Sequence, residues 1–216
     1  MIVMPSNNCK WQVHYWQGVY GGLGHLYSIG GFRGPYPHLP YALDNGRFPA
    51  WSSGKEWSEA DYLKLLDKAS GAARAPMWAL VPDVVGDRPG TLREWAEWAP
   101  RLRTRGWPLA FAAQDGMTPD DVPDDADVVF LGGTTEWKQS VIVPWCARFA
   151  RVHVGRVNTP DMLRYCSEAG AEPCDGTGWF RDPTRTKRIG GLERFLREQS
   201  ERVAIHRMLA PFETDQ

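Results

Sequence analysis

The chain has 216 residues, 43% of them hydrophobic and 24% charged, which is typical of a globular protein large enough to form one domain with a substantial core. A formal net charge of −1 excludes a protein that coats nucleic acid through overall positive charge, but it allows a local basic strip. The sequence contains no run of 18 apolar residues and no signal-peptide pattern, so we expect a single domain over residues 1–216 in the cytoplasm.

From residue 40 onward, a short apolar run followed by a helix-like segment recurs along the chain. The apolar runs are continuous, as expected of parallel strands that are buried on both faces. Ser58 and Thr159 stand where they can cap a helix, and Gly71, Gly106 and Gly170 stand at expected helix ends. The expected strand runs, each with its helical segment, are 41–46 with 58–72, 77–87 with 91–106, 108–116 with 118–126 (too short and proline-broken for a good helix), 127–133 with 135–150, 151–158 with 159–170, and 171–178 with 190–209.

The first 40 residues divide less clearly, and segments 11–20 and 25–32 are candidates for one or two further strands. Repeated strand–helix units with short loops indicate either a doubly wound sheet or a (β/α)8 barrel. No unit carries the glycine-rich fingerprint of a dinucleotide-binding fold. We therefore expect an α/β fold, a compact (β/α)8, TIM-like barrel, regular or irregular.

Polar side chains stand at the ends of several expected strands. The first run ends in Asp44, the second in Asp83, the third in Gln114 and the sixth in Asp175. An aspartate at a strand end commonly caps a turn or a helix, which is the ordinary explanation for each one alone. In a barrel, however, the carboxyl ends of the strands meet at one mouth, where active sites form. A pair of carboxylates there suits glycosyl chemistry, in which one attacks or stabilises a sugar carbon and the other moves protons.

These strand ends, in their order along the chain, resemble the motifs of a known family, the tRNA-guanine (queuine and archaeosine) transglycosylases. They look closest to the relatives that place 7-deazaguanine bases into DNA in bacteria and phages. The resemblance implies a modified TIM barrel without a cofactor, in the cytoplasm of a bacterium or of a phage-infected cell. It also implies exchange of guanine for a 7-deazaguanine through a covalent Asp–sugar intermediate. The segments that carry it are 43–48, 81–87, 111–116, 130–133, 152–163 and 172–181.

Two of these segments carry the implied catalytic residues. Segment 43–48, Leu-Asp-Asn-Gly-Arg-Phe, resembles the family's Asp-Ser-Gly-Gly-aromatic element. The resemblance makes Asp44 the general acid/base and Phe48 the aromatic side chain that lies against the base. Segment 172–181 resembles the stretch with the nucleophile, which is here Asp175.

Three further segments carry the implied recognition of the base. The resemblance assigns the guanine-like edge to Asp83 and an amide contact to Gln114. It assigns the exocyclic carbonyl to backbone N–H groups of Gly132 and Gly133. The chemistry fits, because a carboxylate accepts from N1–H and the 2-amino group together, whereas O6 needs a donor. Segment 152–163 resembles the family's Gly-Ile-Gly-x-Pro-x-x-Leu stretch but adds no role.

The chain departs from the family in its C-terminal part. The family's zinc site, Cys-x-Cys-x-x-Cys with a distant His, is absent, and no cysteine follows Cys174. We expect His206 to be a surface or packing residue of the last helix and the protein to hold no metal. The missing zinc segment and the short chain favour DNA over tRNA as the substrate, together with a 7-deazaguanine base.

The best basic strip lies at 181–188, where four cations accompany one acid, Asp182. We expect phosphate contacts there, beside the sugar that reacts. The alternative is a solvated loop that leads to the last helix. Three arginines at 101–105 are expected instead to be the exposed end of a helix. The cations of the strip are Arg181, Arg185, Lys187 and Arg188.

The cysteines and the remaining histidines receive structural roles. The cysteines form no C-x-x-C pair, so we expect reduced and mostly buried thiols. The histidines stand in an aromatic N-terminal region or within a strand, and we assign them structural or surface roles. The residues concerned are Cys9, Cys146, Cys166 and Cys174, and His14, His25, His38 and His153.

Two other functions stay open at this point. One is an N-glycosyl hydrolase or nucleoside transferase that acts on a small substrate, which the basic strip disfavours. The other is a non-catalytic barrel subunit that binds a partner, which the presence of both Asp44 and Asp175 disfavours. Labelled 7-deazaguanine bases supplied with DNA or with tRNA would separate these functions from base exchange.

Overall fold

The computed structural model describes residues 1–6, 10–180 and 186–209. Its strands are β1 (Val3–Pro5), β2 (His25–Tyr27), β3 (Tyr41–Leu43), β4 (Ala79–Leu80), β5 (Leu109–Ala113), β6 (Val128–Leu131), β7 (Val152–Val154) and β8 (Cys174–Gly176). Its helices are α1 (Trp11–Val19), α2 (Arg47–Ser52), α3 (Glu59–Ser70), α4 (Arg88–Arg103), α5 (Thr135–Arg148), α6 (Pro160–Glu168) and α7 (Thr186–Leu209).

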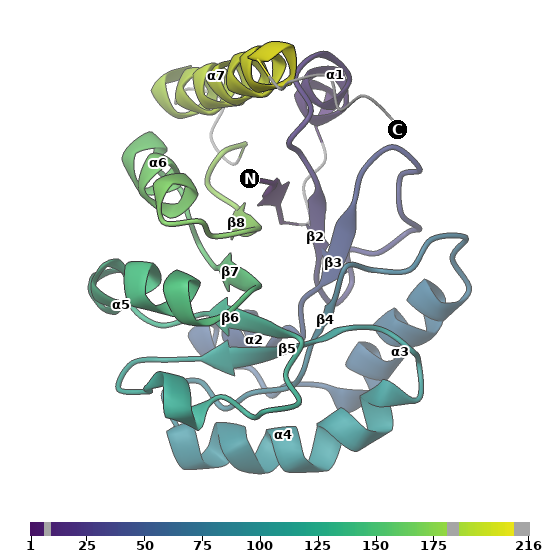
Figure 1. Ribbon diagram of the computed structural model, residues 1–216. Coiled ribbons are helices and arrows are strands. Elements are labelled where there is room, and N and C mark those ends of the chain that lie inside the picture. The colour runs from purple at the N-terminus through teal and green to yellow at the C-terminus, as the bar shows by residue number, and fades with distance from the viewer. Residues whose placement is uncertain (7–9, 181–185, 210–216) are drawn as a thin grey trace, which may run out of the picture.

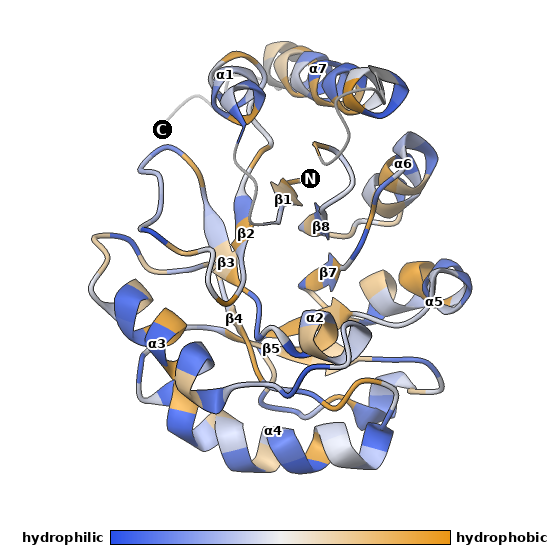
Figure 2. Cartoon of the chain, turned by 180° about the vertical axis from the view of Figure 1, so that it is seen from behind, coloured by the Kyte–Doolittle hydropathy of each residue, from blue (hydrophilic) through white to orange (hydrophobic). Residues whose placement is uncertain are grey.

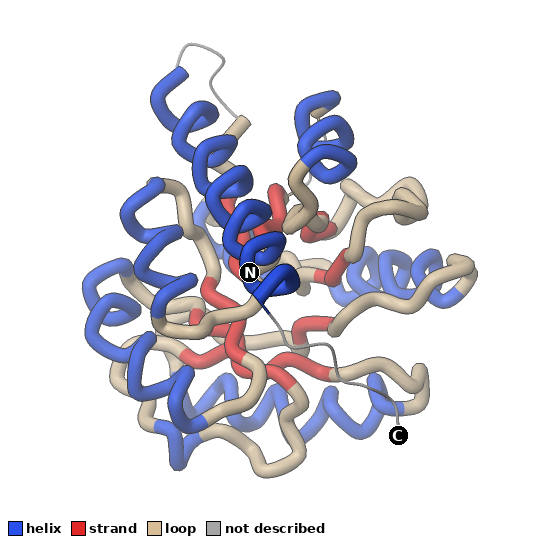
Figure 3. Tube along the Cα trace, turned by 45° about the horizontal axis from the view of Figure 1, so that its top comes forward, coloured by secondary structure: helices blue, strands red, loops and turns tan. Residues whose placement is uncertain are grey.

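The strands form one parallel sheet in the order β1-β8-β7-β6-β5-β4-β3-β2. Two isolated parallel bridges, Val3 with Leu23 and Ser6 with Leu26, bring β1 back beside β2. The sheet is therefore a nearly closed barrel with the helices outside it (Figures 1 and 3). This confirms the expected (β/α)8, TIM-like fold.

The barrel is irregular at two connections within the described residues. No helix stands between β2 and β3, and a 3₁₀ turn at Pro119–Asp121 replaces the helix after β5. The expected weak helix at 118–126 thus reduces to this short turn. After β3, by contrast, two helices follow, because the short helix α2 precedes α3.

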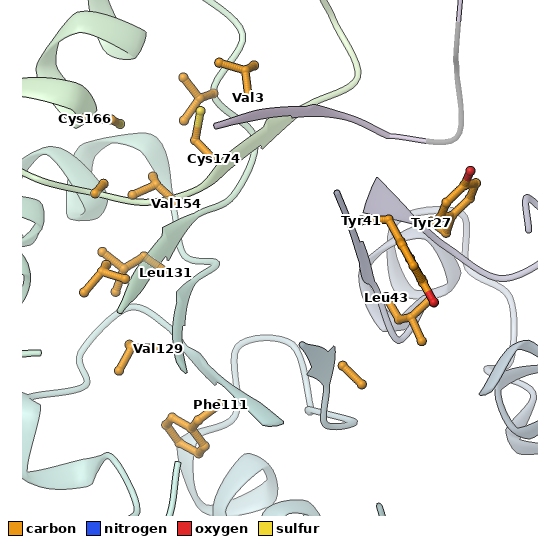
Figure 4. Close-up of a cluster of buried hydrophobic side chains, with 14 of the residues drawn as sticks. Val3, Tyr27, Tyr41, Leu43, Phe111, Val129, Leu131, Val154, Cys166 and Cys174 are labelled. Atoms are coloured by element: carbon orange, nitrogen blue, oxygen red, sulfur yellow. The ribbon is translucent and has the colours of Figure 1, made fainter. Parts of the chain in front are cut away.

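Side chains alternate between the two faces of the barrel wall. Outward-facing residues such as Leu43, Phe111 and Val154 join the core between the strands and the helices (Figure 4). Inward-facing residues such as Ala42, Trp78 and Ala112 form a separate apolar cluster inside the barrel. The sequence shows unbroken apolar runs because both faces are buried.

The helices carry one apolar face each, as a surface layer requires. Helices α3 and α4 mix hydrophobic and hydrophilic residues along their turns (Figure 2). Ser58 accepts from the Asp61 N–H and Thr159 accepts from the Met162 N–H, so both expected helix caps are present. Arg101 pairs with Glu59 and Arg105 with Asp67, which confirms that the arginines at 101–105 belong to an exposed helix end.

The segment 11–20 is a helix, so its candidacy as a strand was wrong. In α1, Val13 and Trp16 are buried, whereas Trp11, Tyr15 and Val19 are exposed. These spacings of three and four residues fit a helix with one face on the core. The first strand lies earlier, at Val3–Pro5, and is too short to stand out in the sequence.

The cysteines that the structure describes carry free thiols, with Cys166 and Cys174 buried and Cys146 half-buried, whereas Cys9 lies outside the described residues. His206 lies on the exposed surface of α7, as expected. In the part of the chain that the structure describes, no helix combines the length and the apolar composition needed to cross a membrane.

Candidate active site at the carboxyl ends of the strands

Three carboxylates come together at the mouth of the barrel. Asp175 lies in β8, Asp44 directly follows β3, and Asp83 follows β4. Burial raises the pKa of Asp44 from 3.8 to about 6, and the negative charges of Asp175 and Asp83 raise it further. Such mutual effects require the three groups to lie within electrostatic reach of one another. The structure therefore brings together the three acids that the strand-end pattern singled out.

The direction of Asp44 and Asp175 follows from the alternation along their strands. Ala42 and Met4 face the barrel interior, and Asp44 stands two residues after Ala42. Asp175 pairs with Met4 in the ladder between β1 and β8. Both carboxylates therefore share the inward-facing position at the carboxyl ends of their strands.

Asp44 stands in a turn that leads into a helix and not into a hairpin. Gly46 has φ +77° and precedes α2, which begins at Arg47. A Cβ at this position would lie 2.6 Å from Ile29, so both the backbone angle and the space require glycine. Hydrogen bonds from the Ser28 side chain and the Gly46 backbone partly offset the effect of burial on the pKa of Asp44.

Asp83 is held by an amide on each carboxylate oxygen. Its side chain is buried, with 8% of the residue exposed. Asn45 Nδ2 donates to Oδ1 at 2.8 Å, and Gln114 Nε2 donates to Oδ2 at 3.0 Å. Burial raises the pKa of Asp83 to about 6, although the bond from Asn45 and the charge of Arg47 act in the opposite direction. The carboxylate is thus fixed in place by neutral donors.

Gln114 is occupied by the protein itself. Its Nε2 also lies 3.1 Å from the Val84 carbonyl oxygen and 3.1 Å from Thr91 Oγ1, and its Oε1 accepts from the Gly86 N–H. The amide therefore ties Asp83 to the loop that begins α4. Its contact with a base stays a prediction, and in this structure Gln114 acts as a support for Asp83.

Asn45 is a site residue that sequence reasoning missed. It is 1% exposed, and besides Asp83 it donates to the Val81 carbonyl oxygen at 2.9 Å. Its Oδ1 accepts from the Arg47 N–H, and its carbonyl accepts from Trp57 Nε1. In the sequence, Asn before Gly indicates only a turn. The bond from Asn45 to a carboxylate 38 residues away leaves no local pattern.

Asp175 is held by different groups on the opposite side of the mouth. It is 5% exposed. His153 Nε2 lies 2.9 Å from Oδ1, and Ser6 Oγ donates to Oδ2 at 3.2 Å. The expected structural role of His153 is therefore incomplete, because this buried side chain contacts the expected nucleophile. Its position in β7, with Val152 and Val154 facing outward, was the available signal.

The two glycines after β6 offer less backbone than expected. The Gly132 N–H already donates to the Ala113 carbonyl at 2.9 Å and so continues the β5–β6 ladder. At Gly133, a Cβ would lie 2.3 Å from the Asp115 carboxylate and 2.4 Å from the Trp137 ring. Gly133 is thus required by packing. The expectation that the Gly132 N–H binds a ligand conflicts with its place in the ladder.

Phe48 contacts a cation from the far side of the barrel. The guanidinium carbon of Arg156 lies 4.3 Å from the centre of the Phe48 ring, and Phe48 is 36% exposed. Arg156 follows β7 and Phe48 follows β3, and these strands are four positions apart in either direction around the barrel. The contact therefore spans the mouth. The Arg156 guanidinium also donates to the carbonyls of Gly132 and Gly133, and Arg156 itself has φ +59°.

Only part of the expected basic strip can be placed. Lys187 is exposed and Arg188 half-buried in the first turn of α7, which follows β8 and so begins at the mouth. A Cβ at Gly178 would lie 3.1 Å from the Arg188 guanidinium, so Arg188 reaches back to the loop after β8. Arg181 and Arg185 lie outside the described residues.

The largest cavity near a chain terminus lies at the other end of the barrel. It measures about 400 Å³ and is lined by residues such as Ile2, Gly22 and Leu196, with Glu172 as its acid. A single acid offers no pair for acid–base chemistry, so the mouth remains the candidate site. Among the described residues, no group of three His, Cys, Asp or Glu side chains could hold a metal ion.

Comparison with known proteins adds no relative. The chain matches no protein-family model and no curated protein. The likeness to transglycosylases therefore depends on the strand-end residues and their arrangement, and it enters below as a proposal.

Proposed function

We propose that this chain is a transglycosylase that replaces guanine in DNA by a 7-deazaguanine base through a covalent Asp–sugar intermediate. The observation that carries the proposal is the convergence of three buried carboxylates at the barrel mouth. Two of them, Asp44 and Asp83, have pKa values of about 6, within reach of the third, Asp175. Acid–base catalysis at neutral pH favours carboxyl groups raised in this way.

The reaction needs two displacements at C1′ of the sugar. In the first, a carboxylate oxygen of Asp175 bonds to C1′ while the bond from C1′ to the guanine nitrogen breaks. The departing base takes a proton from the Asp44 carboxyl group. In the second, a ring nitrogen of the incoming base bonds to C1′ and releases Asp175, and the proton of that nitrogen passes to Asp44. Atoms and charges balance without a further reactant.

Asp83 is suited to recognise the base. Each of its oxygens accepts one amide N–H, which leaves further acceptor capacity on both. A guanine-like edge offers N1–H and a 2-amino group as paired donors, which a carboxylate accepts together. Because Asn45 and Gln114 are neutral, they orient Asp83 without neutralising it. The same edge occurs on guanine and on 7-deazaguanines, as an exchange reaction requires.

The surroundings of the mouth favour a nucleic acid over a small nucleoside. The exposed ring of Phe48 lies under Arg156, and Lys187 and Arg188 lie at the start of α7. Aromatic rings stack on bases, and cations contact phosphates. A nucleotide within duplex DNA would have to flip out of the stack to reach Asp44 and Asp175.

Incorporation of a labelled base tests the proposal. Labelled 7-deazaguanine is incubated with the protein and either guanine-containing DNA or tRNA, and label in the polymer is measured. We expect label in DNA, with release of an equal amount of guanine. Label in tRNA alone would overturn the DNA assignment. Release of guanine without incorporation would identify the hydrolase, and no reaction would favour the non-catalytic subunit.

A further inference from the structure

We propose that His153 is a positioning residue, which holds the Asp175 carboxylate for attack on the sugar by donating a hydrogen bond from a neutral imidazole. The inference deepens the proposed function and rests on it for the role of Asp175. His153 does not touch a substrate, because its side chain is fully buried. Its effect on the reaction must therefore pass through Asp175.

The geometry places His153 directly behind the carboxylate. His153 lies in β7 and Asp175 in the adjacent strand β8, and the two side chains meet at 2.9 Å between Nε2 and Oδ1. The ring stacks on Phe130, with centroids 4.6 Å apart and planes at 13°, and the edge of Trp78 packs against it at 4.9 Å. This aromatic packing inside the barrel fixes the plane of the imidazole.

The hydrogen-bond partners select one tautomer. A carboxylate oxygen only accepts, so Nε2 must carry the proton. The other nitrogen, Nδ1, is buried and has no hydrogen-bond partner in the described part of the structure. A proton there would leave a buried N–H unsatisfied and a charge on the ring. Both observations fit the neutral Nε2–H form.

The groups around His153 act in the same direction. Burial and the nearby ammonium of Lys138 lower the pKa of His153, although the bond and the charge of Asp175 act against them. Lys138 comes from α5, Asp175 from β8, and the remaining contacts are the rings of Phe130 and Trp78. The imidazole thus donates without becoming a counter-ion that would neutralise the nucleophile.

The second oxygen of Asp175 is held from the other neighbouring strand. Ser6, which follows β1, donates to Oδ2, whereas His153 from β7 donates to Oδ1. Because β1 and β7 flank β8 on its two sides, the carboxylate is held from both. Both donors are uncharged, so the negative charge stays on Asp175 and faces the mouth.

Two variants separate this role from mere packing. His153→Phe keeps a ring between Phe130 and Trp78 but removes the donor. His153→Gln removes the ring but keeps an N–H that can reach Oδ1. We expect His153→Phe to slow formation of the covalent adduct with DNA by about 10- to 100-fold, with unchanged affinity for the base. His153→Gln should stay within about 5-fold of the wild type, since one charge-assisted hydrogen bond survives.

A packing role predicts the reverse order, with His153→Phe the more active variant, and that result would overturn the proposal. Equal loss in both variants at unchanged melting temperature would also overturn it. Loss of base affinity with an unchanged rate would show that His153 acts on binding and not on the nucleophile.

Nitrogen NMR of the imidazole tests the arrangement without any substrate. The His153 signals are assigned by their absence in His153→Gln. We expect a neutral ring with the proton on Nε2 between about pH 5.5 and about pH 8. A proton on Nδ1, or an imidazolium in this range, would contradict the proposal. If the wild type forms no adduct with DNA, the proposed function fails, whereas this measurement still decides how His153 holds Asp175.

Discussion

Asp83 and Asp175 stand on two sides of the barrel mouth and are buried to a similar degree, 8% and 5% exposed, yet they are supported differently. Asp83 accepts from two amides that extend from the ends of β3 and β5. Asp175 accepts from an imidazole and a hydroxyl on the strands beside its own. Rigid amides suit a group that reads a base edge repeatedly, and neutral donors behind Asp175 suit one that must form and break a bond.

Asp44 lies between the two sides in electrostatic terms, because the charges of both other acids raise its pKa. Its own partners are a hydroxyl and a backbone N–H. The comparison therefore assigns one task to each carboxylate: recognition to Asp83, attack to Asp175 and proton transfer to Asp44. Each prediction below removes or weakens one of these tasks.

Asp175→Asn should give the largest effect. The amide cannot attack C1′, so base exchange should fall below detection while the fold is kept. Incorporation of labelled base into DNA measures this loss. Asp67→Asn is the matched control, because Asp67 is an exposed acid that pairs with Arg105 far from the three carboxylates. Exchange by Asp175→Asn at the rate of this control would remove Asp175 from the mechanism.

Asp44→Asn should slow both displacements by about 10²- to 10⁴-fold, the usual contribution of a general acid/base. In the wild type, the pKa of about 6 predicts opposite pH dependences for the two steps. Adduct formation needs the protonated acid and should fall above about pH 6, whereas resolution of the adduct needs the carboxylate and should fall below about pH 6. Single-turnover kinetics from acid to neutral pH measures both. The same pH profile in Asp44→Asn would assign the titrating group elsewhere.

Asp83→Ala should weaken binding of a 7-deazaguanine by about 100-fold, because a paired, charge-assisted contact to the base edge is lost. Calorimetry with the free base measures the affinity. Asn45→Ala should cost less, about 5- to 20-fold, because Gln114 still holds one oxygen of Asp83. Equal effects of the two substitutions would show that Asn45 and not the carboxylate carries recognition.

The stability of Asp44→Asn should exceed that of the wild type at neutral pH. The pKa of Asp44 is about 6 in the folded protein against 3.8 for the ordinary group, so the folded state binds the proton more tightly. The stability from this proton is fully present below about pH 4 and is lost as the pH rises through about 6. Asp44→Asn should therefore gain about 1–3 kcal/mol over the wild type at about pH 7.5 and nothing near pH 4.

Urea unfolding at several pH values measures this difference. His25, with its pKa lowered to about 4 by burial and by the nearby His14, has the opposite pH dependence. It is present in both proteins and cancels in the difference. A gain in stability that is the same at all pH values would show that the effect does not come from the proton on Asp44.

Lys187→Ala should have the smallest effect, a weakening of DNA binding by a few fold. Loss of one phosphate contact should lower the slope of log affinity against log salt by about one unit. The control is Arg101→Ala, because Arg101 is a similarly exposed cation that pairs with Glu59 at the far end of α4. Equal slopes for Lys187→Ala and the wild type would remove Lys187 from the interface.

The sequence predicted the barrel and the convergence of Asp44, Asp83 and Asp175, because strand ends in a barrel must meet. It failed where a contact joins distant segments, as in the bond from Asn45 to Asp83. It also misjudged Gly132, whose N–H is used by the β5–β6 ladder, since pairing cannot be seen from one strand alone. Strand alternation could have identified Ser6 and His153, which share the inward face with Met4 and Phe130.

The most direct test of the account is to locate the covalent bond. The protein is mixed with guanine-containing DNA without an incoming base, denatured, digested with protease and nuclease, and examined by mass spectrometry. The account predicts a sugar attached to the peptide that contains Asp175, which disappears when a 7-deazaguanine is added before denaturation. A sugar on the peptide of Asp44 or Asp83 would contradict the assignment of roles, and the absence of any adduct while exchange proceeds would contradict the covalent mechanism itself.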